Sequence, residues 1–128
     1  MVSRKRSRKA AEEALAAVEP TITLGAGLET ELVQGLAVLW RGGRLCDVTI
    51  VVQERGFRAH RVILAAISEP MRALFESGLS DGNSPSVKLD ELDANVFEPL
   101  LEHCYTGVCS FPESLLSPVM QAAARLQL

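Results

Sequence analysis

The fold of this chain is decided by two stretches, LCDVTIVV at residues 45–52 and FRAHRVILAA at residues 57–66. The first is rich in β-branched residues. The second begins as a short extended piece and becomes an apolar run of good helix formers. This pattern predicts strands at 48–52 and 57–60 and a helix from Arg61 to Ile67. Neither stretch pairs a nucleophile with a base, so both indicate a packing nucleus rather than an active site.

Turn and capping residues divide the chain around this nucleus. The polar residues 53–56 predict a hairpin turn, with Gly56 able to supply a positive φ. The remaining elements are predicted as a helix from Met71 to Ser77 capped by Ser68, a strand at 86–89, a helix capped by Asp93 and ended by Gly107, and an extended piece from Val108 to Phe111. Pro99 lies inside the Asp93 helix, so we expect that helix to kink or to become regular only near Glu98.

The last helix is predicted to start at Ser117 and Pro118, with serine as N-cap and proline in the first helical position. Its buried side is predicted to comprise Val119, Met120, Ala123 and Leu126.

Five strings, in register, carry a resemblance to a known family. They are LCDV at 45–48, AHRVILAA at 59–66, FESGL at 75–79, YTG at 105–107 and AAARLQL at 122–128. Together they resemble the BTB/POZ domain family, most closely its kelch-like members, over about residues 28–128. The resemblance implies an α+β fold with a small mixed sheet covered by helices, a two-fold dimer formed through the first helix, and further helices after Leu128.

Length and composition favour one folded domain. The chain has 128 residues and is 48% hydrophobic, which is enough for a single core. Charge interrupts every apolar run well before the length of a membrane span, and no apolar segment follows the basic N-terminus to make a secretory signal. Three cysteines, an odd number, fit a reducing cytoplasm or nucleus better than a disulfide framework.

Charge separates an N-terminal arm from the domain. Residues 1–19 hold five basic and three acidic side chains, whereas the rest of the chain holds eight basic and thirteen acidic ones. We expect residues 1–26 to be a disordered arm and residues 27–128 to be the domain. The acidic balance of the domain argues against nucleic-acid binding. The basic cluster Arg4–Lys9 remains open as a nuclear-import signal, a weak polyanion contact or a solvated tail.

A leucine stripe marks the helix predicted from Leu28 to Trp40, which Gly42 and Gly43 end. The stripe consists of Leu28, Leu32, Leu36, Leu39 and Trp40. Such a stripe can lie on its own domain. The family resemblance implies instead that it packs on a second copy across a two-fold axis, which is the interpretation we favour.

Polar residues near the nucleus invite functional hypotheses. His60 looks catalytic beside Arg61, but it lacks a substrate pocket, and we expect its ring to bond backbone at a helix start. Asp47 and Arg61 match positions that line a charged pocket at the dimer interface of repressor-type BTB domains, and a simple ion pair without a ligand is the alternative. The trio His103, Cys104 and Cys109 lacks a fourth ligand at usual spacing, so we expect neither zinc nor any other cofactor.

The family resemblance also suggests a partner. Leu79 and Asp81 match the place where cullin-binding BTB domains carry a hydrophobic residue, then any residue, then glutamate. Tyr105 is expected nearby on the same side. An ordinary acidic loop is the alternative for Asp81. The sequence thus predicts no enzyme but a homodimeric adaptor resembling those of cullin-type ubiquitin ligases. The second hypothesis is a nuclear co-regulator dimer that binds a corepressor peptide.

Overall fold

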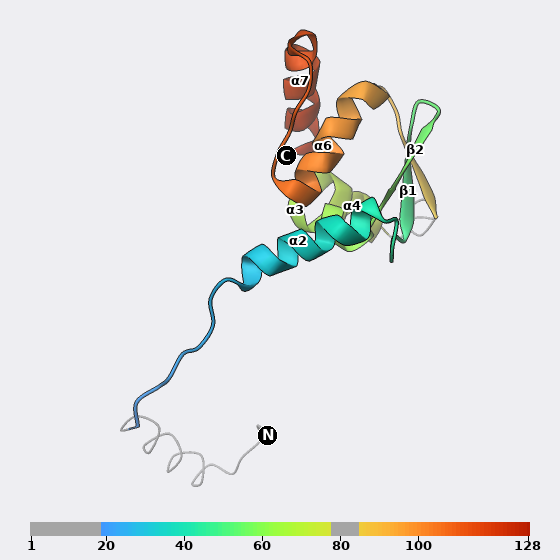
Figure 1. The fold of residues 1–128 in the computed structure, drawn as a ribbon. Helices are drawn as coiled ribbons and strands as arrows, with labels where there is room; N and C mark the ends of the chain where they lie inside the picture. The colour runs from blue at the N-terminus through green and yellow to red at the C-terminus, as the bar shows by residue number, and fades with distance from the viewer. Residues whose placement is uncertain (1–18, 78–84) are drawn as a thin grey trace.

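The structure, a computed structural model, describes residues 19–77 and 85–128. These residues form an α+β fold in which helices pack beside a small sheet (Figure 1). The elements in chain order are α2 (Leu28–Arg41), β1 (Val48–Val52), β2 (Arg55–Ala59), α3 (Arg61–Ile67), α4 (Glu69–Glu76), β3 (Ser86–Leu89), α6 (Ala94–Thr106), the short 3₁₀ helix η1 (Glu113–Leu115) and α7 (Leu116–Leu126). The predicted fold class is confirmed.

The sheet is mixed, as predicted, and β1 lies at its centre. β1 pairs antiparallel with β2, where Val48 faces Ala59, and parallel with β3, where Ile50 faces Val87. Val48, Ile50 and Val52 are fully buried, while the residues between them are half-buried. This alternation follows from the two-residue period of a strand, because every second side chain points to the same face.

The hairpin turn is shorter than predicted, since β2 begins at Arg55 rather than at residue 57. Val52 pairs with Arg55, so Gln53 and Glu54 make the turn, and the positive φ of 57° belongs to Gln53. The prediction that Gly56 supplies it is wrong. A Cβ atom at Gly56 would lie 3.1 Å from Cγ2 of Thr49, so the strand partner is what limits the size of the residue at this position.

Two predicted helix caps are confirmed. The Ser68 hydroxyl accepts a hydrogen bond from the Met71 amide at 3.3 Å and donates one to the Leu126 carbonyl at 2.7 Å. The Asp93 carboxylate accepts from the Asn95 amide at 2.7 Å. Ser68 therefore both starts α4 and ties it to the end of α7.

Helix α6 begins at Ala94 and continues through Pro99. The prediction that its regular part starts near Glu98 is therefore wrong. The Pro99 ring is buried, so apolar packing helps to offset the hydrogen bond that proline cannot donate. Gly107 ends the helix with a φ of 79°, as predicted.

The start of the last helix differs from the prediction. Helix α7 begins at Leu116, directly after η1, so Ser117 lies within the helix instead of capping it. Its buried residues are Val119, Ala122 and Leu126, whereas Met120 is exposed. Met120 follows Val119 by one residue, about 100° around the helix, which turns it away from the core.

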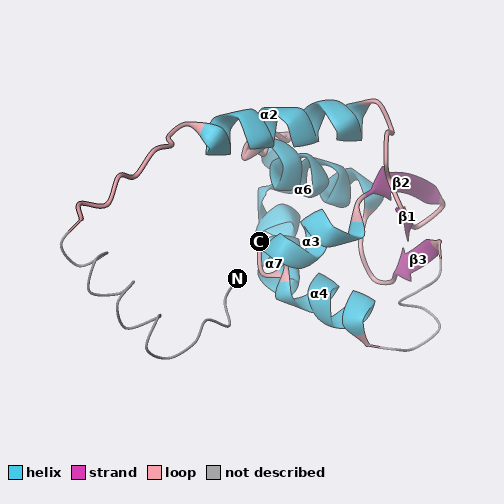
Figure 2. Cartoon of the chain, turned by 90° about the horizontal axis from the view of Figure 1, so that it is seen from below, coloured by secondary structure: helices cyan, strands magenta, loops and turns pink. Residues whose placement is uncertain are grey.

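The helices and the sheet share one core. Figure 2 shows α2 alongside α6, with α3, α4 and α7 beyond them and the sheet at one end of the helices. Residues 19–27 have no regular secondary structure and extend away from the domain. In the described part of the chain, no helix is long and apolar enough to span a membrane.

Candidate protein-interaction surfaces

Helix α2 carries the most conspicuous exposed apolar surface. Leu28 is 69% exposed and Leu32 is 56% exposed, and both belong to the first two turns of α2. The N-terminal end of α2 projects beyond the rest of the domain (Figure 1). We define the α2 face as Leu28, Leu32 and the half-buried Leu39, which lie within about 40° of one another around the helix. An exposed group of this kind is typical of a protein-interaction surface.

The other end of the helix packs on its own domain. Leu36 and Trp40, predicted as dimer contacts, are half-buried against the core, and Ala37 is buried. The Trp40 ring stacks on Tyr105, with the centroids 4.7 Å apart and the planes 3° apart. The Trp40 indole N–H donates to the Arg58 carbonyl at 3.1 Å. These contacts anchor α2 to its own domain at the Trp40 end.

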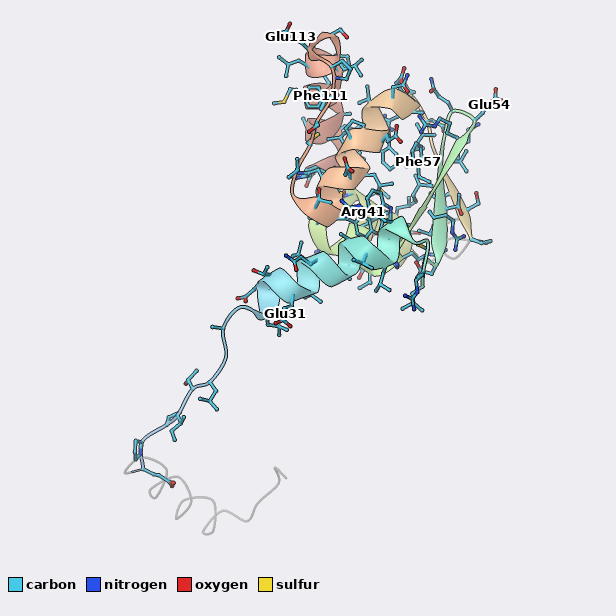
Figure 3. All side chains as sticks on the ribbon, in the orientation of Figure 1. Glu31, Arg41, Glu54, Phe57, Phe111 and Glu113 are labelled. Atoms are coloured by element: carbon cyan, nitrogen blue, oxygen red, sulfur yellow. The ribbon has the colours of Figure 1, made fainter. Side chains whose placement is uncertain are left out.

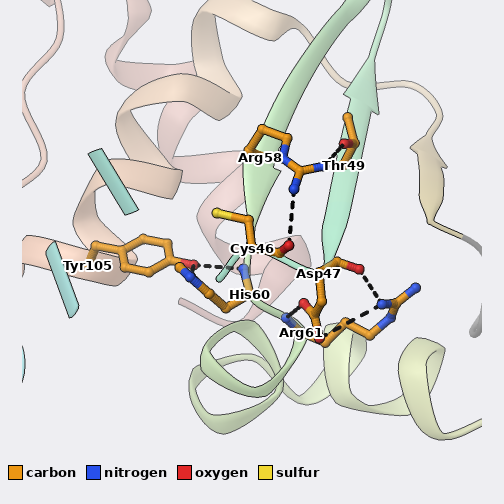
Figure 4. Close-up of polar contacts among 7 residues, drawn as sticks. All are labelled: Cys46, Asp47, Thr49, Arg58, His60, Arg61 and Tyr105. Atoms are coloured by element: carbon orange, nitrogen blue, oxygen red, sulfur yellow. Dashed lines mark hydrogen bonds and ion pairs between the residues drawn. The ribbon is translucent and has the colours of Figure 1, made fainter. Parts of the chain in front are cut away.

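Tyr105, on which Trp40 stacks, forms a hydrogen-bonded pair with His60. Figure 4 shows the contact between Tyr105 and His60. The Tyr105 hydroxyl oxygen accepts from the His60 amide at 2.9 Å and lies 2.7 Å from His60 Nδ1. His60 Nε2 lies 2.8 Å from the Arg44 carbonyl oxygen. Because a carbonyl only accepts, we assign the ring proton to Nε2, which leaves Nδ1 to accept from the Tyr105 hydroxyl. The predicted structural role of His60, bonded to backbone at a helix start, is confirmed.

Tyr105 does not meet the expectation of a surface contact. Its side chain is only 2% exposed, because Trp40 covers the ring and His60 takes the hydroxyl. Burial raises the pKa of Tyr105 well above its ordinary value; the His60 N–H opposes this shift, and nearby Cys46, Cys104 and Asp47 add to it. The residue therefore supports the fold rather than offering a contact to a partner.

Asp47 and Arg61 form a charged corner at the start of α3 (Figure 4). Asp47 Oδ1 accepts from the Arg61 amide at 2.8 Å, and Asp47 Oδ2 lies 3.8 Å from Arg61 Nη1, which also bonds the Asp47 carbonyl oxygen. The Arg61 guanidinium lies 5.8 Å from the centroid of the Phe75 ring. The two predicted residues are thus brought together, and their place in a dimer interface stays a prediction.

The cysteines are free and half-buried. Burial, with Cys109 nearby, raises the pKa of Cys104 to about 11, and burial together with the Glu102 carboxylate raises the pKa of Cys109. Within residues 19–77 and 85–128, no three His, Cys, Asp or Glu side chains gather where they could hold a metal ion.

Other predicted site residues lie outside the described residues. These are Leu79 and Asp81, expected to contact a cullin, and the basic cluster Arg4–Lys9. Their roles stay predictions.

Sequence reasoning missed a groove of about 500 Å³ over one side of α6. We call it the acidic aromatic groove, and its principal lining residues are Trp40, Phe57, Glu98, Glu102, Phe111 and Leu115. These side chains come from four separate parts of the chain, so no local pattern could have indicated that they meet.

Comparisons with known proteins agree with this architecture. A model of the BTB/POZ domain family matches residues 36–128. The chain is 34% identical to mouse Kelch-like protein 26 over 103 residues, which are 80% of this chain and 17% of that protein. It is 35% identical to Zinc finger and BTB domain-containing protein 44 of Xenopus tropicalis over 102 residues, again 80% of this chain and 23% of that protein. The chain therefore spans less than a quarter of either relative.

A solved BTB domain has a similar fold. The BTB domain of zebrafish PATZ1 superposes with a TM-score of 0.73 at 28% sequence identity, over 84% of this chain and 87% of that one. The similarity thus extends over most of both chains.

Proposed function

Because this chain belongs to the BTB/POZ domain family, whose members are protein–protein interaction modules, we propose that it acts as a homodimer formed through α2. The observation that carries this proposal is the α2 face, where Leu28 and Leu32 are more than half exposed in a single chain. Burying such side chains stabilises an interface by about 25 cal/mol per Å² of apolar area.

The apolar surface continues beyond the helix. Ile22 and Leu24, in the extended segment before α2, are both strongly exposed. A second copy related by a two-fold axis would cover the same face on each protomer, which is how isologous dimers are built. Ile22 and Leu24 would enlarge the area available to such a partner.

A pair of leucine substitutions tests the dimer. Leu32→Glu places a charge in the α2 face, and Leu116→Glu makes the same change on α7, where Leu116 is similarly exposed at 52%. We expect light scattering at tens of micromolar to report a dimer for the wild type and for Leu116→Glu but a monomer for Leu32→Glu. A wild-type monomer would contradict the proposal.

The proposed role of the dimer is that of an adaptor for a cullin-type ubiquitin ligase. The kelch-like relatives favour it, and Leu79 with Asp81 would supply the contact. Aspartate keeps the charge of the glutamate usual in cullin-binding members but has one methylene less of reach. Titration with a purified cullin scaffold tests this role. We expect the wild type to bind and Leu79→Glu to bind at least tenfold more weakly, and equal binding by both would contradict the assignment.

The alternative is a nuclear co-regulator whose dimer binds a corepressor peptide. Relatives with zinc fingers favour it, and so does the partly exposed Asp47–Arg61 pair, which could meet a peptide at the interface. The basic cluster Arg4–Lys9 would fit nuclear import. Binding of a corepressor peptide that is lost in Arg61→Ala, with no binding of the cullin scaffold, would favour this role over the adaptor.

A further inference from the structure

Carboxylates and aromatic rings meet in the acidic aromatic groove. Helix α6 contributes Glu98 and Glu102, and the walls include Phe57 from β2 and Phe111 from the segment after α6. In the view of Figure 3, Phe57 and Phe111 lie on opposite sides of α6. The volume of about 500 Å³ falls within the range of protein sites that hold ligands, roughly 300–1,000 Å³. The groove is therefore large enough to admit side chains of another molecule.

A contact at the edge of the groove shows which chemical group suits these walls. The Arg55 guanidinium lies 4.8 Å from the centroid of the Phe57 ring, and Arg55 Nη2 lies 3.2 Å from Glu98 Oε2. One arginine thus contacts an aromatic and an acidic residue of the groove at the same time. A lysine ammonium is a point charge without a flat face, so it cannot stack and pair in this way.

The second carboxylate of the groove has no such partner. In the part of the chain that the structure describes, no hydrogen bond or ion pair reaches the carboxylate of Glu102, which is half-buried. Burial raises the pKa of the Cys109 thiol, and the Glu102 carboxylate adds to this shift, so its charge lies close to the segment that leads to Phe111. A free carboxylate is therefore present on the Phe111 side of the groove.

Phe111 offers aromatic surface near this charge. Its side chain is half-buried, and among the described residues no cation lies over its ring. Glu102 also follows Glu98 by one helical turn, a spacing at which two like charges repel each other. A cation bound to Glu102 would offset that repulsion, as Arg55 does at Glu98.

We propose that the acidic aromatic groove binds an arginine-bearing segment of another protein, with the guanidinium paired to Glu102 and stacked on Phe111. The charge of the domain favours such a partner, because residues 20–128 hold eight basic and thirteen acidic side chains. Trp40, the α2 residue that lines the groove, lies about 100° around the helix from Leu39 of the α2 face. The proposal therefore rests neither on the α2 dimer nor on the cullin contact.

Nuclear magnetic resonance titration of the full chain tests the groove directly. Trp40 is the single tryptophan, so its indole N–H gives one resolved signal from a residue that lines the groove. The probe is the capped peptide Gly-Arg-Gly-Arg-Gly, and the control peptide has lysine in place of arginine. We expect the arginine peptide to shift this signal and to bind about threefold more tightly than the lysine peptide, the scale of an exposed cation–π contact. Equal affinities, or no shift at millimolar peptide, would overturn the proposal.

Substitutions locate the binding residues. Glu102→Gln removes the charge but keeps the shape, and it should weaken binding of the arginine peptide by about fivefold, the upper end for a partly exposed ion pair. The matched control Glu31→Gln should leave the affinity unchanged, since Figure 3 shows Glu31 on α2 far from Phe111. Phe111→Leu should abolish the preference for arginine over lysine. Equal affinity of the wild type and Glu102→Gln, or an equal loss in Glu31→Gln, would overturn the proposal.

Two other occupants of the groove would also be recognised. In the Leu32→Glu variant, whose α2 face is charged, a Trp40 signal that shifts with protein concentration before any peptide is added would assign the groove to a second copy. Peptide binding that appears only after the five basic residues of 4–9 are replaced by glutamine would assign it to this chain's own N-terminal arm. Either result would overturn the role of another protein.

Discussion

Trp40 of α2 lies flat on Tyr105 of α6, with the ring centroids 4.7 Å apart. The stack lies directly above the hydrogen bonds between Tyr105 and His60, so it joins the first helix of the domain to the start of α3. A helix that ends with this contact can present its opposite end to a partner without losing its own attachment. The dimer surface proposed for α2 depends on that attachment.

Replacing Trp40 should therefore affect the stability of the single domain. We expect Trp40→Ala to lower the free energy of unfolding by about 2–3 kcal/mol, because it removes the stack and the half-buried indole. Trp40→Phe keeps a ring on Tyr105 and loses only the N–H bond to Arg58, so it should cost about 1 kcal/mol. Urea unfolding measures both values. Equal losses in the two variants would contradict the role given to the stack.

A second prediction concerns what the Tyr105 hydroxyl contributes to the free energy of unfolding. Tyr105→Phe preserves the ring stack but leaves the His60 amide and Nδ1 without their common partner. Leaving buried polar groups unpaired costs about 1–3 kcal/mol, which urea unfolding should detect. The α2 helix should remain in place, as a native quenching constant of Trp40 would show. An unchanged free energy of unfolding would mean that the His60 contacts contribute nothing.

Alkaline pH should unfold the chain by ionising the Tyr105 hydroxyl. Burial raises the pKa of Tyr105 in the folded state, whereas the unfolded chain ionises near its ordinary value of about 10. Above that pH the unfolded state binds fewer protons, so the stability present below pH about 10 is lost as the pH rises. Since Tyr105 is the single tyrosine, tyrosinate absorbance should appear together with the loss of far-UV circular dichroism. Tyrosinate appearing in a still-folded chain would contradict this expectation.

The sequence could predict the elements but not how they cover one another. The β-branched run at 48–52 and the caps Ser68 and Asp93 are local patterns, and the strand and the two caps predicted from them are present in the structure. Helical periodicity shows that a face of α2 is apolar. It does not show whether the same domain or a second copy covers that face. Trp40 was therefore assigned to a partner although its ring packs on Tyr105.

The hairpin turn and the acidic aromatic groove also depend on tertiary contacts that local sequence patterns do not show. Gly56 was assigned a positive φ because glycine adopts it easily, whereas the structure places that conformation at Gln53, a choice set by strand register. The acidic aromatic groove joins α2, β2, α6 and the segment before α7. Only the tertiary fold brings these side chains together, so no sequence spacing encodes the groove.

The charged corner predicts a difference between two substitutions at Asp47. Asp47 Oδ1 accepts from the first amide of α3, so Asp47→Ala should cost about 1–2 kcal/mol, the usual loss for a helix cap. Asp47→Asn keeps an acceptor and loses only a partly exposed ion pair with Arg61, so it should cost less than about 1 kcal/mol. Thermal unfolding of both variants measures the difference. Equal losses would show that charge, rather than capping, dominates at Asp47.

The close approach of Gly56 to Thr49 can be tested by a rescue experiment. A methyl group at residue 56 would lie 3.1 Å from Cγ2 of Thr49, so Gly56→Ala should lower the free energy of unfolding by about 1–3 kcal/mol, as overpacking does. Thr49→Ser removes Cγ2 and retains the oxygen that accepts from Arg58 at 3.2 Å, which makes it a matched partner. We expect the double variant to recover about 1 kcal/mol or more relative to additivity, because the clash needs both groups. Additive losses in urea unfolding would mean that Gly56 is required for its backbone rather than for the space it leaves to Thr49.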